Sequence, residues 1–192
     1  MQLFQDLQYQ NIDFTIEVFP KGEYEACQFQ NCNMSNLDLT GYIFIDCTFE
    51  NSNLSLVKLH NTILRDIKFK GCKMIGLQFC DANDFGLAVQ FEDCILTNAS
   101  FYKTKLKKTK FIGSKLNEVD FTESDLAAAV FTNSDLSNAI FSFTNLEQAD
   151  FRGAIHYTID PEDNKLKKSK HNMDGLAGLL LKYGIDIERE IN

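Results

Sequence analysis

FEDCILTNASFYKTKLKKTKFIGSKLNEVDFTESDLAAAVFTNSDLSNAIFSFTNLEQADF, residues 91–151, decides the fold of this chain. Every fifth residue of the stretch is Phe or Leu, in strict alternation. These positions are Phe91, Leu96, Phe101, Leu106, Phe111, Leu116, Phe121, Leu126, Phe131, Leu136, Phe141, Leu146 and Phe151. Helices have a period of about 3.6 residues and strands a period of about two. A period of five therefore predicts short units that bury their apolar side only by stacking on one another.

A second column and an upstream frame extend this pattern. Two residues before each Phe or Leu is a small or β-branched residue, from Val89 and Cys94 to Ala149. Upstream, apolar residues recur every five positions from Phe4 to Phe79. Twelve residue steps separate Phe79 from Phe91, where two units need ten. We therefore predict a two-residue insertion near 80–90, formed as a bulge or short loop.

Composition places the chain among cytoplasmic proteins of one domain. Its 192 residues are 44% hydrophobic, and no apolar run approaches the roughly 18 residues of a membrane span. The amino terminus has no basic region followed by an apolar stretch, so we expect no signal peptide.

The six cysteines indicate packing rather than metal or disulfide chemistry. Five of them lie in the column of small residues two positions before each apolar residue of the repeat, which we call the small column. These are Cys27, Cys32, Cys47, Cys72 and Cys94, and only Cys80 lies outside it. The sequence contains no CxxC pair and just three His. We therefore expect free buried thiols, with no metal and no cofactor.

Four units in particular carry a family resemblance: SerAspLeu at 124–126, SerAspLeu at 134–136, ThrAsnLeu at 144–146 and AlaAspPhe at 149–151. They resemble the consensus of the pentapeptide-repeat family. The resemblance implies an all-β, right-handed quadrilateral β-helix over residues 1–159, with one unit per face and four units per coil. A residue then lies over the one twenty positions later, and the units make about seven coils.

Charge provides an independent test of this register. Lys105 falls over Asp125, Lys115 over Asp135, and Lys103 over Glu123. Neighbouring coils lie roughly 4.8 Å apart, so opposite charges at these positions can pair. Exposed pairs of this kind contribute only about 0.5 kcal/mol each, so they specify register more than they add stability.

Residues 160–192 follow a different pattern. AspProGluAspAsn at 160–164 predicts a turn, and a helix follows with an apolar face of Leu176, Leu179, Leu180 and Tyr183. Asn172 or Asp174 can begin this helix and Gly184 can end it. The helix could cap the last coil. Alternatively, as resemblance to the quinolone-resistance members implies, it could form a homodimer in which Ile185 and Ile187 of an extended tail also contact the partner.

No catalytic constellation is evident, so we expect a protein that is not an enzyme. The Asp and Asn residues that precede Leu or Phe are expected to face outward and bond the turn backbone. Six lysines form a basic belt: Lys103, Lys105, Lys107, Lys108, Lys110 and Lys115. Because three of them stack over acids, we expect a solvated face rather than direct binding of nucleic acid.

Resemblance to the Qnr-type branch implies a DNA-mimicking protein that binds a type II topoisomerase, DNA gyrase or topoisomerase IV, and protects it from quinolones. The candidate acidic partner surface is Asp120, Glu123, Asp125, Asp135 and Asp150. Asp81, Asp84 and Phe85 at the insertion are possible loop contacts. The alternative is a general protein-interaction scaffold with another partner. A continuous acidic stripe would favour the mimic, and acids spread over four faces would favour the scaffold.

Overall fold

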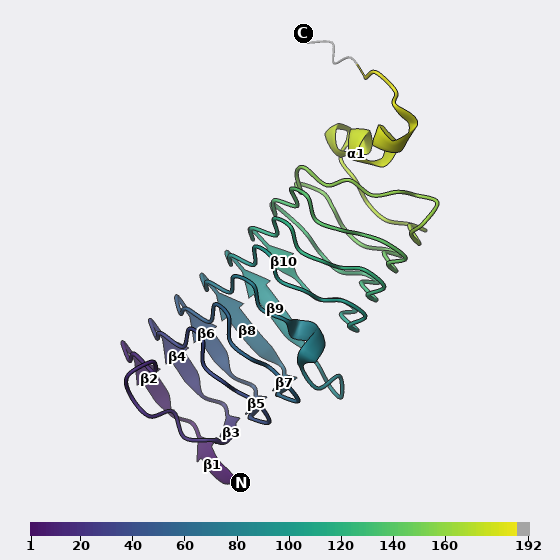
Figure 1. Ribbon diagram of the computed structural model, residues 1–192. Coiled ribbons are helices and arrows are strands. Elements are labelled where there is room, and N and C mark those ends of the chain that lie inside the picture. Colours follow the sequence, from purple (N-terminus) through teal and green to yellow (C-terminus); the bar gives the residue numbers. More distant parts are fainter. Residues whose placement is uncertain (188–192) are drawn as a thin grey trace.

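The computed structural model describes residues 1–187 and shows a parallel β-solenoid that rises as a rod from the N-terminus to a short C-terminal helix (Figure 1). Its strands are β1 (Gln2–Gln5), β2 (Gln8–Gln10), β3 (Gly22–Glu25), β4 (Gln28–Gln30), β5 (Ile43–Ile45), β6 (Thr48–Glu50), β7 (Ile63–Arg65), β8 (Ile67–Lys70), β9 (Val89–Glu92) and β10 (Phe111–Ile112). Its helices are η1 (Phe79–Asp81), η2 (Met173–Leu176), α1 (Ala177–Leu180) and η3 (Leu181–Tyr183).

The strands form two parallel sheets on neighbouring faces of the rod. One sheet has the order β1-β3-β5-β7 and the other β10-β9-β8-β6-β4-β2. Phe4 pairs with Tyr24, Tyr24 with Phe44, and Phe44 with Leu64. This spacing of twenty residues confirms the predicted β-helix.

The predicted insertion is confirmed by the register. Phe69 pairs with Phe91, a step of twenty-two residues, whereas Phe91 pairs with Phe111 at the usual twenty. Above β10 the remaining units are held by isolated parallel bridges rather than by regular strands. The ladder also extends beyond residue 159, the boundary predicted from sequence, because Lys165 pairs with Asn145 and Lys170 with Asp150.

Strict alternation of Phe and Leu places the aromatic residues on two opposite faces of the coil. On one face Phe111 stacks over Phe91 and under Phe131, at centroid separations of 5.0 and 5.1 Å. On the opposite face Phe101 stacks on Phe121 at 5.4 Å. Rings of the two columns meet edge-on across the interior, as Phe101 and Phe111 do at 83°, which is a favoured aromatic geometry.

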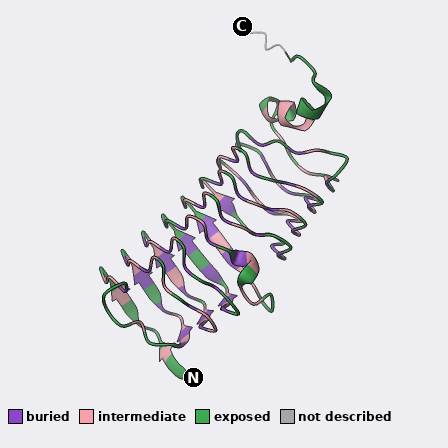
Figure 2. Cartoon of the chain, in the orientation of Figure 1, coloured by how far each residue is buried: buried purple, intermediate pink, exposed green. Residues whose placement is uncertain are grey.

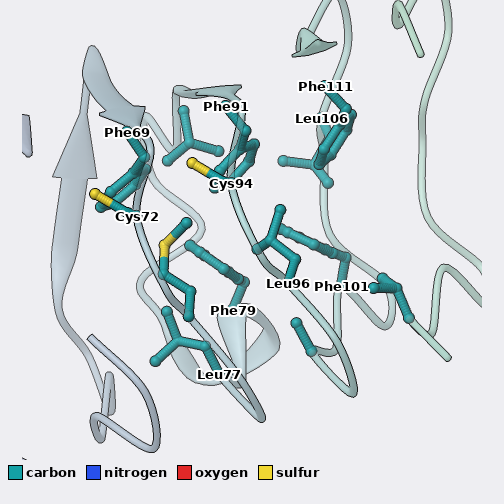
Figure 3. Packing of buried hydrophobic residues seen from close by; sticks show 14 of the residues in the cluster. Phe69, Cys72, Leu77, Phe79, Phe91, Cys94, Leu96, Phe101, Leu106 and Phe111 are labelled. Carbon is teal, nitrogen blue, oxygen red and sulfur yellow. The ribbon is translucent and has the colours of Figure 1, made fainter. Parts of the chain in front are cut away.

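The small column closes a set of buried hydrogen bonds. Side chains in this column donate to the backbone carbonyl twenty-three residues earlier, as Cys72 does to Phe49 at 3.3 Å and Thr62 to Leu39 at 2.7 Å. Five cysteines are buried as expected, and Cys80 is partly exposed. Figure 3 shows Cys72 beside the ring of Phe69 and Cys94 beside the ring of Phe91. A thiol therefore serves here as a small hydrophobe with a weak donor.

The predicted C-terminal helix forms, but it is short and is flanked by 3₁₀ turns. Asn172 precedes it in extended backbone, and Gly184 ends it with φ +60°. The helix lies on the last coil, where the Ile159 amide donates to the Gly178 carbonyl at 3.1 Å. Residues 185–187 are assigned to no strand, and residues 188–192 of the expected tail lie outside the described part of the chain.

The aromatic columns should dominate stability. Phe111 is fully buried between two stacked rings, so Phe111→Ala should lower the free energy of unfolding by about 3–5 kcal/mol. Phe85 is 74% exposed, and Phe85→Ala should change stability by less than about 0.5 kcal/mol. Urea denaturation measures both; equal losses for the two variants would contradict the stacked core.

Candidate interaction surfaces

The five candidate acidic residues do not form one stripe. Asp120, Asp125, Asp135 and Asp150 each belong to a different bridge ladder. These ladders are Ser100–Asp120–Ile140, Lys105–Asp125–Asn145, Lys115–Asp135–Ile155 and Val130–Asp150–Lys170. Each ladder runs along one face of the rod, so the four aspartates point out from four faces. Glu123 lies at the corner that follows Asp120.

The local role of these aspartates is the one predicted from the sequence. The Thr122 amide donates to Asp120 Oδ1 at 2.9 Å, and the Ser137 amide donates to Asp135 Oδ1 at 3.1 Å. A short carboxylate is suited to this bond because it reaches the amide two residues later. Each aspartate therefore stabilises its own corner of the coil, whatever else it contacts.

Basic side chains accompany most of the candidate acids. Glu123 lies 3.4 Å from Lys103, and Asp125 lies 3.2 Å from Lys107. The Arg152 guanidinium lies 2.7 Å from Asp150 and holds the pKa of that carboxyl below its usual range. Because the charges are paired across or within coils, this region presents alternating charge rather than a line of uncompensated carboxylates.

The backbone register agrees with the predicted pairing of opposite charges, but most of the predicted side-chain ion pairs do not form. Backbone pairing places Lys105 beside Asp125 and Lys115 beside Asp135, as predicted. Of the three predicted ion pairs, however, only Lys103 with Glu123 forms. Asp125 is contacted instead by Lys107, while the Lys105 ammonium lies 4.0 Å from Asp84. Lysine side chains are long and flexible, so their ammonium groups can reach a carboxylate in a different ladder.

Asp135 is the most strongly stabilised carboxylate of the set. Partial burial by itself raises its pKa, but hydrogen bonds from Ser137, His156 and Asn117 outweigh this effect and hold the pKa far below the usual range. His156 Nδ1 lies 3.0 Å from the Asp135 carboxylate, and the Asn117 side-chain Nδ2 donates to the same carboxylate at 3.1 Å. The Asp135 side chain is thus part of a small polar network on its face.

The insertion forms a small protrusion on the rod (Figure 1). Asp81 ends the turn η1, and the Phe85 amide then donates to Asn83 Oδ1 at 2.9 Å. Phe85 itself is 74% exposed and Gly86 has φ +76°. The candidate loop contacts Asp81, Asp84 and Phe85 are therefore close together, with an exposed aromatic ring among carboxylates.

The C-terminal helix divides its apolar residues between two tasks. Leu179 packs against the core, and Gly175 and Gly178 lie against Tyr157 of the last coil. Four of the other expected dimer residues are exposed: Leu176 37%, Leu180 37%, Tyr183 51% and Ile185 53%. Ile187 is also exposed. One side of the helix thus caps the rod, and the rest of its apolar surface is open.

An ion-pair clamp that the sequence reasoning missed fixes this helix. The Lys182 ammonium lies 2.6 Å from Asp160 and 2.7 Å from Glu162, and the Tyr183 hydroxyl donates to Glu162 at 3.0 Å. Asp160 and Glu162 belong to the turn that was predicted only as a chain reversal. The feature of the sequence that could have indicated these ion pairs is the positive charge of Lys182 near the end of the predicted helix.

Comparison with known proteins agrees with this architecture. A family model described as a pentapeptide repeat region matches residues 23–84 and 87–155, so the unmatched residues 85 and 86 coincide with the insertion. Among solved structures, a trypsin-treated form of QnrB1, a plasmid-mediated fluoroquinolone resistance protein, is similar over 97% of this chain and 100% of its own, with 17% identity and a TM-score of 0.65.

A weaker likeness links the chain to HetL, a pentapeptide repeat protein involved in heterocyst differentiation regulation in the cyanobacterium Nostoc sp. strain PCC 7120. That comparison covers 88% of this chain and 86% of HetL, at 17% identity and a TM-score of 0.40. No curated protein matches the sequence. Within residues 1–187, helices of the length and apolarity needed to cross a membrane are absent.

The Asp135 network should give stability a recognisable pH dependence. Its folded pKa lies below the ordinary value of 3.8, so its contribution is present above that value and is lost as the pH falls through the folded pKa. Asp135→Asn should therefore lower the free energy of unfolding at pH 7, and its difference from wild type should shrink below about pH 4.

Thermal or urea denaturation between pH 2.5 and 7 measures this difference. Asp84→Asn is the control, because the Asp84 side chain is 80% exposed. A wild-type advantage over Asp135→Asn that stays constant across the range would contradict the assignment.

Proposed function

Because the chain belongs to the pentapeptide repeat family, we propose that it is a non-enzymatic rod that binds another protein. The observation that carries the proposal is the division of side chains in each unit. The interior Phe or Leu and the small column are buried, and the remaining positions face outward at regular intervals. Such a rod presents four long faces on a rigid scaffold, which suits binding of an extended protein surface.

A type II topoisomerase, DNA gyrase or topoisomerase IV, is the first partner to test. Support comes from the similarity in shape to a fluoroquinolone resistance protein over 97% of this chain and 100% of that structure. A partner of this kind would place the protein in the cytoplasm. The exposed Phe85 and Asp84 at the insertion are side chains that could contact such a partner directly.

The charge distribution favours the second candidate, a scaffold for a different protein. The four candidate aspartates point from four faces, and three of the five candidate acids, Glu123, Asp125 and Asp150, have a basic neighbour. A DNA duplex instead presents closely spaced, uncompensated negative charge. Mimicry of DNA by this rod would therefore have to rely on the N-terminal half, where residues 1–50 hold eight acids and one base.

Association through the C-terminal helix is part of the proposal. The exposed leucines 176, 180 and 181 lie at the end of the rod, where a two-fold axis would place two helices together. Leu179 is already engaged with the core, so a substitution there would damage the cap as well. The residues suited to testing a dimer are Leu180 and Leu181.

At low protein concentration and 20 mM salt, the double variant Leu180→Asp/Leu181→Asp should be monomeric, because four carboxylates would meet at the shared helical interface. The wild type should have the mass of a dimer under the same conditions. Light scattering coupled to size exclusion measures both masses. Leu56→Asp is the control, since Leu56 is 58% exposed and distant in sequence from the helix. Equal masses for the wild type and the double variant would exclude the helical interface.

Purified wild-type protein should inhibit DNA supercoiling by gyrase or rescue the enzyme from ciprofloxacin, and the monomeric variant should do neither. A supercoiling assay with and without the drug tests this prediction. If the wild type affects neither gyrase nor topoisomerase IV at large molar excess, the topoisomerase is not the partner. The scaffold proposal then requires capture of a different protein.

A further inference from the structure

The N-terminal end of the rod differs from the C-terminal end. Strands β1 and β2 are the outermost strands of their sheets, and within residues 1–187 neither has a ladder partner on its outer side. Figure 1 shows the helix over the last coil and no comparable element over the first. Figure 2 shows β1 and β2 largely exposed. This end therefore has an open sheet edge.

The next coil shows which backbone groups of β2 point to this edge. The Gln28 backbone amide donates to the Leu7 carbonyl at 2.9 Å, and the Gln30 backbone carbonyl accepts from the Asn11 backbone amide at 3.0 Å in the same ladder. Gln8 and Gln10 occupy the equivalent positions one coil earlier. Their amide and carbonyl groups thus point toward a preceding coil, and residues 1–187 supply none.

The two edge strands themselves carry no charged residue and no proline that would oppose strand pairing. Natural edge strands are protected by Lys or other charges, by Pro, or by a bulge. Strand β1 reads Gln-Leu-Phe-Gln and β2 reads Gln-Tyr-Gln, without a charged residue or a proline. Exposed apolar side chains surround them, including Leu3, Leu7, Ile16 and Val18. Both the backbone and the rim are therefore suited to receive another strand.

We propose that this edge pairs with the same edge of a second copy of the chain. In an antiparallel pair related by a two-fold axis at Tyr9, each Gln8 lies opposite the other copy's Gln10. The Gln8 amide of each copy then donates to the Gln10 carbonyl of the other. A second copy fits because its edge carries the same outward-facing backbone amides and carbonyls, so the two-fold axis pairs those of Gln8 in each copy with those of Gln10 in the other.

Tyr9 strengthens this pairing. Its ring stacks on Phe29 at 4.9 Å and 4°, as the first member of the column that continues through Phe49 and Phe69. The ring is only partly buried, since residues 1–187 place no coil on its outer side. In the paired state the two Tyr9 rings lie on the same side of the joined sheet, and the aromatic column runs from one rod into the other.

Charge sets the conditions for association. Asp6, Asp13 and Glu17 lie near the same end, with Lys21 as the nearest base in sequence. Two such ends repel each other at low ionic strength, and salt screens this repulsion. End-to-end pairing should consequently tighten as salt rises from 20 to 300 mM, opposite to the behaviour of an interface held by ion pairs.

The test uses the full chain carrying Leu180→Asp/Leu181→Asp, so that association through the C-terminal helix does not contribute. In this background, sedimentation equilibrium at 300 mM salt and high protein concentration should show a monomer–dimer equilibrium, although the same variant is monomeric when dilute and at low salt. Adding Gln8→Lys/Gln10→Lys places like charges opposite each other and should weaken the dimer about tenfold or more. The matched control is Gln28→Lys/Gln30→Lys, which changes the net charge equally one coil further in.

The control pair should leave the dimer intact, and urea denaturation should show that both lysine variants remain folded. A background protein that stays monomeric at every concentration and salt would overturn the proposal. So would a dimer that both lysine pairs weaken equally. The inference is independent of the topoisomerase proposal, because neither the partner nor the C-terminal helix enters the measurement.

Discussion

The corner of the coil is the constraint on which the rest of the structure depends. About one residue in five adopts a left-handed backbone, as Asn31, Asn51, Gly71 and Asp93 do in successive coils. This conformation costs most residues about 1 kcal/mol, and Gly, Asn and Asp tolerate it best. With a turn at every fifth residue, four units close one coil and each residue meets the one twenty positions later. This turn at every fifth residue is the reason that the sequence has a period of five.

Once the corners are set, packing determines which residues occupy the interior. Because Phe and Leu alternate, Phe occupies one pair of opposite faces of the coil and Leu occupies the other pair. Each phenyl ring therefore stacks on another ring in the next coil. The small column leaves room for these rings and satisfies interior carbonyls through its thiols and hydroxyls. Outward positions are then free to vary, and any binding function is confined to them and to the two ends of the rod.

Prediction from sequence worked where a single periodic rule governs the structure. The stacked repeat and the two-residue insertion followed from counting in fives, and the β-helix followed from the resemblance of the units to the pentapeptide-repeat consensus. The insertion accounts for the step of twenty-two residues between Phe69 and Phe91. The spread of Asp120, Asp125, Asp135 and Asp150 over four faces also follows from the twenty-residue coil, although charge counting along the chain obscured it.

Side-chain choices were less predictable. Lys107 rather than Lys105 reaches Asp125, because flexible chains are not bound to a ladder. The periodicity of the C-terminal helix also did not reveal which of its four predicted apolar residues contacts the core. In the structure it is Leu179 alone. That outcome depends on the fit of Gly175 and Gly178 against Tyr157.

Residue-resolved amide hydrogen exchange tests the twenty-residue coil most directly. The amides of Phe111, Phe121 and Phe131 donate to Val130, Ile140 and Asp150 in the following coil. These amides should exchange slowly and together, since opening any one of them requires separating two coils. Exchange as rapid as that around Gly86 in the insertion, or protection in long runs of consecutive residues as in a helix, would contradict the stacked-coil account.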